Sequence, residues 1–346
     1  MNTRGRAARS VGPPDGLAPL QAPPLPAHDP ADPVENAVIR GLSRSWPRRA
    51  AVKKKEPDLD ELFDPDRDDY PESLMPFRTH PRYDALDEER RARLRAWAWI
   101  AYNKSVVDIE QYVVNPGFGV ITSDVFGLGP GDTTTIGVMQ AMVDEQYHTL
   151  MHQNANALTR RRRGWSLPDA VLPHGRTVRA HDAAVAAAAD PRAAALVRFA
   201  YATVAETSIS AYLGLLTGDE RLQPVNRSTV AVHRRDELCH GSLAGELLTM
   251  VFDSLGAAER DRLLDLLAVG VDEFTASDLE TWTAIVRHEA VPGGDGMMRD
   301  VAEFAANAPV VQDCSAIGRL GASLGVGADL GGRLTADRTA GSGPGA

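Results

Sequence analysis

Apolar residues recur every three or four positions through most of the chain after residue 85, which is the spacing of helices that bury one face. Segments that contain proline, glycine or clustered polar residues interrupt this pattern. The helices that it predicts span residues 87–114, 132–163, 191–216, 225–255, 257–270, 272–289 and 298–307. Alternation with a period of two is nowhere sustained, so the pattern predicts an all-α protein.

Capping residues and helix breakers set the expected ends of the first two helices. The acidic run that starts at Asp87 suits a helix N-terminus, and the sequence Asn115-Pro-Gly is expected to stop that helix. The second helix is expected to open near Asp132 or Thr133, which are good capping residues. It should close at Arg160–Arg163, because positive charges stabilise a helix C-terminus.

The composition changes along the chain and divides it into four parts. Residues 1–35 are rich in proline, alanine and aspartate and are predicted to be a disordered extension. Residues 36–84 are expected to form an irregular arm that packs on the core. Residues 85–326 form the predicted helical domain, and the Gly-rich tail at 327–346 is predicted to be disordered.

Overall composition restricts the class of protein. A chain of 346 residues with 43% hydrophobic and 24% charged residues suits one large soluble domain. The net charge of −10 argues against nucleic acid as a partner, and no apolar run is long enough to cross a membrane. With no signal peptide recognised and only Cys239 and Cys314 as cysteines, we expect a reducing, cytoplasmic location.

Seven residues of types that bind metals lie in four of the predicted helical segments: Glu110, Glu145, His148, Glu206, His233, Glu237 and His240. A Glu-x-x-His pair places a carboxylate and an imidazole on one helix face, about one turn apart. Two such pairs with one glutamate from each of two other helices form the ligand set of ferritin-like di-iron bundles. One pair alone is common by chance and a mid-helix glutamate usually faces solvent, but the ordered set is specific.

The types of ligand favour particular metals. Four carboxylates and three imidazoles without a thiolate suit iron or manganese better than a structural zinc, and the choice between Fe/Fe and Mn/Fe stays open. Asp144 and Asp236 each lie four residues before a ligand histidine on the same helix. Each is either a hydrogen-bond acceptor for that imidazole or a solvated neighbour of the ligand stripe.

Each of several other side chains allows two interpretations of its role. Met139 and Met142 either line a substrate cavity or belong to the plain core. Arg319 either is buried and pairs with a substrate carboxylate or forms a surface ion pair. His152, one turn beyond His148, fits a packed or exposed histidine better than a partner of the ligands.

With His233 added one turn before Glu237, the seven residues resemble the ligands of the p-aminobenzoate N-oxygenase family over roughly residues 85–325. The resemblance implies a ferritin-like core with two iron ions that cycle between Fe²⁺ and Fe³⁺. It implies that O₂ and an external electron donor convert a small, aromatic amine to hydroxylamine, nitroso and nitro products in bacterial secondary metabolism. A homodimer is usual for the family.

Two other functions compete with N-oxygenation. A ferritin-like di-iron hydroxylase or desaturase would share six of the ligands, because a fold does not fix a reaction. Only His233 distinguishes the N-oxygenase from such a hydroxylase or desaturase. An iron-storage protein is less compatible with the chain, since its long terminal extensions would crowd a shell of many subunits.

Overall fold

The computed structural model describes residues 37–55, 57–305 and 315–340, and these are mostly helical. Within these ranges the one β-type contact is an isolated bridge between Asp68 and Leu222, so the predicted all-α class is confirmed. None of the described helices is both long and apolar enough to cross a membrane. The extension predicted at residues 1–35 lies outside the described residues.

The helices of the described residues, in chain order, are α1 (Ala37–Arg49), η1 (Ala51–Lys53), η2 (Glu72–Leu74), α2 (Pro81–Asp84), α3 (Glu88–Ile109), η3 (Glu110–Val114), α4 (Asn115–Thr122), α5 (Asp132–Arg163), η4 (Asp169–Val171), α6 (Arg176–Ala186), α7 (Pro191–Thr217), α8 (Pro224–Ser254), α9 (Ala257–Thr275), α10 (Leu279–His288), α11 (Gly294–Ala305), α12 (Ser315–Ser323) and α13 (Gly327–Ala340).

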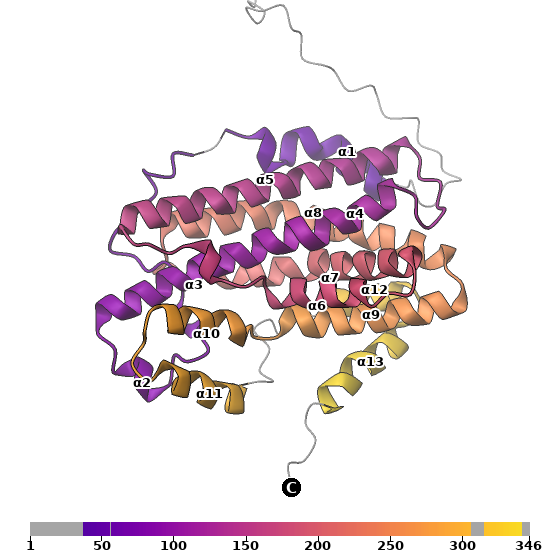
Figure 1. Cartoon of the computed structure of the whole chain (residues 1–346). Helices are drawn as coiled ribbons and strands as arrows, with labels where there is room; N and C mark the ends of the chain where they lie inside the picture. Colours follow the sequence, from indigo (N-terminus) through magenta and orange to yellow (C-terminus); the bar gives the residue numbers. More distant parts are fainter. Residues whose placement is uncertain (1–36, 56, 306–314, 341–346) are drawn as a thin grey trace, which may run out of the picture.

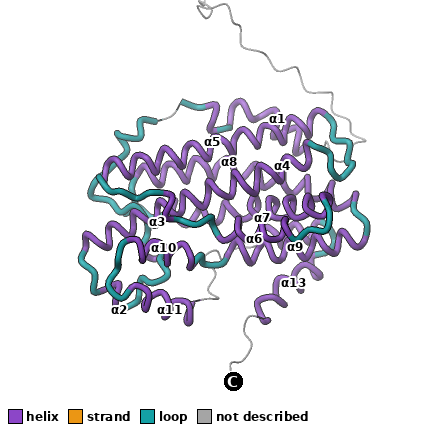
Figure 2. The backbone as a smooth tube through the Cα atoms, viewed as in Figure 1, coloured by secondary structure: helices purple, strands orange, loops and turns teal. Residues whose placement is uncertain are grey.

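Four long helices make the central bundle. α3, continued by η3 and α4, packs against α5 and α7, and α8 packs against both α5 and α7. Figure 1 shows α1 lying along the outer side of α5, with α6, α9, α12 and α13 on the opposite side of the bundle. The tube in Figure 2 shows the helices joined by loops and turns. The arrangement is that of a ferritin-like bundle with added helices.

The first long helix does not stop where the sequence predicts. Asn115-Pro-Gly is inside a continuous helical path, because α3 passes through the π-helical segment η3 directly into α4. Pro116 directly follows the π-helical segment, whose wider turn interrupts the regular α-helical hydrogen bonding there, so the missing N–H is tolerated. The predicted stop is therefore wrong.

Both ends of the described chain hold more helix than expected. The arm predicted to be irregular begins with the 13-residue helix α1, although the rest of it contains only short helices and turns. The tail predicted to be disordered from residue 327 forms α13 up to Ala340. Leu330 is buried and Arg333 pairs with Asp261 and Asp265 of α9, so this prediction is wrong.

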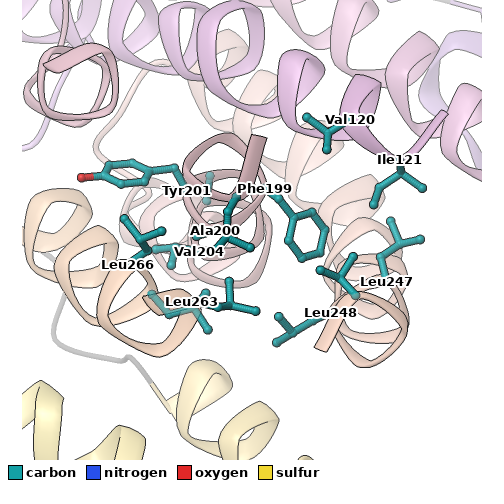
Figure 3. Close-up of a cluster of buried hydrophobic side chains, with 14 of the residues drawn as sticks. Val120, Ile121, Phe199, Ala200, Tyr201, Val204, Leu247, Leu248, Leu263 and Leu266 are labelled. Carbon is teal, nitrogen blue, oxygen red and sulfur yellow. The ribbon is translucent and has the colours of Figure 1, made fainter. Parts of the chain in front are cut away.

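The core beside the bundle comes from α4, α7, α8 and α9. Figure 3 shows Phe199 and Val204 of α7 between Ile121 of α4 and the leucines of α8 and α9. Small residues bring these helices unusually close. A Cβ on Gly117 would lie 2.2 Å from that of Ala202.

The same close approach occurs beside the ligand residues. A Cβ on Gly241 of α8 would lie 3.1 Å from the backbone oxygen of Glu206 on α7. The backbones of α7 and α8 therefore nearly touch at this level. This contact fixes the distance between Glu206 and the side chains that α8 points inward.

Candidate metal centre

The seven predicted ligand residues converge inside the bundle from four helical segments. Glu110 comes from η3, Glu206 from α7, and the two Glu-x-x-His pairs with His233 come from α5 and α8. All seven side chains are buried, none more than 2% exposed. The helical spacing and the order of these residues, matched to the ligand set of di-iron bundles, predicted this convergence.

Ligand atoms fall into two overlapping groups, and within each group they lie within 4.8 Å of one another. The first group, which we call site A, consists of Glu110, Glu145, His148, His233 and Glu237. The second, site B, consists of Glu145, Glu206, Glu237 and His240. Because Glu145 and Glu237 belong to both, they are placed to bridge two ions. Because it includes His233, site A has one more ligand residue than site B.

Distances between side chains indicate which imidazole nitrogen faces the centre. Nδ1 of His148 lies 2.9 Å from Oε2 of Glu145, and Nδ1 of His240 lies 2.5 Å from the other oxygen of Glu145. Nε2 of His233 lies 3.0 Å from Oε1 of Glu237. The two Glu-x-x-His histidines therefore face the carboxylates with Nδ1 and His233 with Nε2.

The carboxylates of the cluster are electrostatically unsatisfied. Burial, together with the charges of neighbouring glutamates, raises the pKa values of Glu110 and Glu206 well above their usual range. Both carboxylate oxygens of Glu110 and one each of Glu206 and Glu237 are buried without a hydrogen-bond partner among the described residues. Four carboxylates carry the charge that two divalent cations would neutralise, so the donor set fits a dinuclear metal centre.

The outward-facing nitrogens of two histidines meet carboxylates from the opposite helix. Nε2 of His240 lies 3.2 Å from Asp144, and Nε2 of His148 lies 3.4 Å from Asp236. The sequence had suggested that each aspartate serves the histidine four residues later on its own helix. The structure exchanges the partners, because histidines that point into the seam between α5 and α8 present their second nitrogen to the facing helix.

Three groups of the N-terminal arm contact these two aspartates. The indole N–H of Trp46 donates to both oxygens of Asp144 at 2.9 and 3.0 Å, and the backbone N–H of Ala51 donates to Asp236 at 2.9 Å. The Arg49 guanidinium lies 3.8 Å from Asp144 and 4.0 Å from Asp236. Sequence reasoning missed these contacts because it took the arm as irregular, although Ile39, Leu42 and Trp46 recur there at helical spacing.

His233 is also oriented by a partner, which is His152. Its Nδ1 lies 2.9 Å from Nε2 of His152, whose Nδ1 lies 2.7 Å from Oδ1 of Asn103. Burial and the neighbouring His233 lower the pKa of His152, so it is neutral. His233 can therefore donate to His152, which donates to Asn103. The preferred interpretation of His152 as a histidine without a site role overlooked this contact, although it lies on the ligand stripe.

Three residues considered for substrate binding do not join the cluster. Met139 is 49% exposed, and Met142 packs against the apolar core. Arg319 is exposed on α12 and donates to Ser315 Oγ at 2.8 Å. The suggestion of a buried arginine at this position is therefore wrong.

A cavity of about 100 Å³ lies on the α3 side of the bundle, and none of the seven ligand residues lines it. Tyr102 lies in its wall, stacks on Tyr212 at 4.7 Å, and lies 6.5 Å from the ring of His152. Ile109, the neighbour of the ligand Glu110, also lines it. Further aromatic lining comes from Tyr70, Phe274 and Trp282.

Comparison with known proteins relates the chain to a family and to a relative of known activity. The model of the family described as p-aminobenzoate N-oxygenase AurF matches residues 32–325. The chain is also similar to a 4-aminobenzoate N-oxygenase from Streptomyces thioluteus. The two are 32% identical over 297 residues, which cover 85% of this chain and 88% of that relative.

Proposed function

Because the chain belongs to the p-aminobenzoate N-oxygenase family, we propose that it uses two iron ions and O₂ to oxidise the amine of a small aromatic substrate. The observation that carries the proposal is the pair of overlapping ligand groups inside the bundle. Iron suits their oxygen and nitrogen donors, and when bound it supplies the activation of O₂.

The protein's own residues would hold the two ions unequally. Site A provides five ligands and site B four, so site B keeps more positions open for O₂ or substrate. Asp144 and Asp236 hold the imidazoles of His240 and His148 in one orientation and increase their basicity. Burial of the whole cluster excludes bulk water from the reaction.

The cavity beside Tyr102 supports an aromatic substrate. The wall contains the stacked pair Tyr102–Tyr212 and the tilted pair Tyr70–Tyr102, and such rings can pack against an arylamine as aromatic pairs do in cores. Lys104 and Arg176 lie in the same wall. Lys104 pairs with Asp108 and Arg176 with Glu273, each at 2.6 Å. A substrate carboxylate, such as that of the 4-aminobenzoate in the name of the Streptomyces thioluteus relative, would bind these cations in exchange for their present partners.

The remaining parts of the proposal follow from the family. Successive turnovers take the amine through hydroxylamine and nitroso stages to a nitro group in bacterial secondary metabolism. An external donor supplies electrons, and the enzyme works in the cytoplasm as a homodimer. The exposed apolar side chains of Met139, Val143 and Leu150 on α5 support a second copy as a partner.

Isotope labelling tests the reaction directly. The iron-loaded protein, a chemical reductant and ¹⁸O₂ are incubated with 4-aminobenzoate, and products are analysed by mass spectrometry. We expect the label on nitrogen. Label on a ring carbon would instead identify a hydroxylase, and iron uptake without any oxidised product would remove the oxygenase proposal.

A further inference from the structure

Positive charge is concentrated on the segment that covers the outer side of the metal centre. Residues 37–55, which comprise α1, η1 and two residues after it, contain seven basic residues and no acidic one, whereas the chain as a whole has a net charge of −10. We call these the cationic surface: Arg40, Arg44, Arg48, Arg49, Lys53, Lys54 and Lys55.

Part of this charge is not neutralised by the residues that the structure describes. In the part of the chain that the structure describes, Arg44, Arg48 and Lys55 are exposed and form no ion pair. The basic run at the end of α5 behaves differently: Arg160, Arg161, Arg162 and Arg163 pair with Asp169, Asp60, Asp60 and Asp69. The cationic surface therefore projects a positive field into solvent.

A hydrogen-bonded path leads from this surface to the metal ligands. Trp46 is only half-buried, and its ring lies 4.4 Å from the ammonium of Lys53. Its indole N–H binds Asp144, which binds Nε2 of His240, and Nδ1 of that histidine faces the centre. Hydrogen bonds join Trp46 to Asp144 and Asp144 to His240. The path therefore offers strong electronic coupling between the surface and the metal centre.

A neighbouring cavity adds to the same binding surface. It has a volume of about 250 Å³ and lies between η1, α5 and α8. Lys54, Lys55 and Arg235 line it together with Tyr147 and Met151, and no acidic residue is in its described wall. A carboxylate side chain of an approaching protein would find cations there without competing anions.

We propose that the cationic surface docks a small, acidic iron–sulfur protein, and that Trp46, Asp144 and His240 carry its electrons to the irons. This rests on the proposed function, because a di-iron oxygenase needs electrons from outside to reduce its irons. Two docking events oxidise two reduced carriers, and the two electrons convert two Fe³⁺ to two Fe²⁺. No bond or proton is exchanged in the transfer.

The test uses a reduced, acidic plant-type [2Fe–2S] ferredoxin as the probe. Binding of oxidised ferredoxin to the metal-free protein is measured by calorimetry, and electron transfer to the Fe³⁺ protein by stopped-flow absorbance. Arg44→Glu with Lys55→Glu should weaken binding by about tenfold or more. The matched control, Arg262→Glu with Arg299→Glu, lies on α9 and α11 and should leave binding unchanged. High salt should weaken wild-type binding.

Trp46→Phe separates docking from transfer, because it keeps an aromatic ring but removes the N–H that binds Asp144. Ferredoxin binding should stay unchanged, whereas the rate of reduction by ferredoxin, divided by the rate of reduction by dithionite, should fall by about tenfold or more. An unchanged ratio would overturn the path. If both double variants bound ferredoxin equally well, the docking surface would be overturned. It would also be overturned if the wild-type protein bound anionic vesicles but not ferredoxin. Failure of dithionite-reduced enzyme to oxidise arylamines would instead refute the proposed function.

Discussion

Asp144 of α5 lies 3.2 Å from Nε2 of His240 on α8, and Asp236 of α8 lies 3.4 Å from Nε2 of His148 on α5. The two contacts cross between the helices, so each helix supplies the carboxylate that orients the other helix's imidazole. The crossing also links each aspartate to a different metal site, because His148 belongs to site A alone and His240 to site B alone.

Asp144→Asn and Asp236→Asn should therefore perturb different irons. An amide keeps the size of the side chain but loses its charge, and such changes typically lower metal affinity by about 10–100-fold. Mössbauer spectra of the ⁵⁷Fe-loaded variants would reveal which iron changes. If both variants altered the same quadrupole doublet, the assignment of His148 and His240 to separate ions would be wrong.

The four glutamates should differ in how much iron they retain when replaced. Glu145→Ala and Glu237→Ala should remove most of both irons, because these carboxylates belong to both ligand groups. Glu110→Ala and Glu206→Ala should each weaken one iron. Iron per chain, measured after gel filtration, checks this, with circular dichroism as the control for folding. Equal losses in all four variants would contradict the bridging geometry.

His233→Ala should preserve the helical fold but weaken one iron, because it reduces site A from five ligands to four. Arylamine oxidation should fall by orders of magnitude. His152→Ala removes only the partner of His233, so iron should stay bound with affinity lowered by about tenfold. A His233→Ala protein with full arylamine oxidation would make a carbon hydroxylase or desaturase the better hypothesis.

Asp69 should make the free energy of unfolding depend on pH. Its pKa is raised to about 6, because burial outweighs the nearby Arg163. Between the usual value of 3.8 and about 6, the folded state holds the proton more tightly than the unfolded state. Stability therefore falls as pH rises through this range, by about 3 kcal/mol in total.

The measurement compares wild type with Asp69→Asn by urea denaturation at several pH values, since all other titrating groups cancel in the difference. Relative to the variant, wild type should lose stability from pH 4 to pH 7. A relative gain over that range would mean that the ion pair with Arg163, 2.9 Å away, dominates over burial.

The sequence was enough to predict the helical class and the convergence of the seven ligand residues, because helical spacing is a local property that survives folding. It did not suffice for their surroundings. Trp46 and Ala51 reach Asp144 and Asp236 across 98 and 185 residues of chain, and the spacing of apolar residues within the arm does not say which helices of the core it covers. Only tertiary packing decides such contacts.

Two misjudgements have clear physical origins. Proline normally ends a helix, but Pro116 follows a π-helical segment and occupies the first turn of α4, where it is tolerated. His152 lies on the ligand stripe, yet its position one turn beyond His148 did not indicate what it would contact. The deciding contact comes from His233 on another helix.

The π-helical segment η3 makes sequence distances from Glu110 misleading. One extra residue in a helix rotates everything after it by about 100° and advances it by about 1.5 Å. Glu110 stands at the first position of this segment, so no single helical wheel describes both α3 and α4. A sequence comparison that assumes a fixed spacing between this glutamate and the apolar residues of α4 will therefore misalign relatives whose helix has no π-helical turn. Such a comparison must allow an insertion or deletion of one residue directly after Glu110.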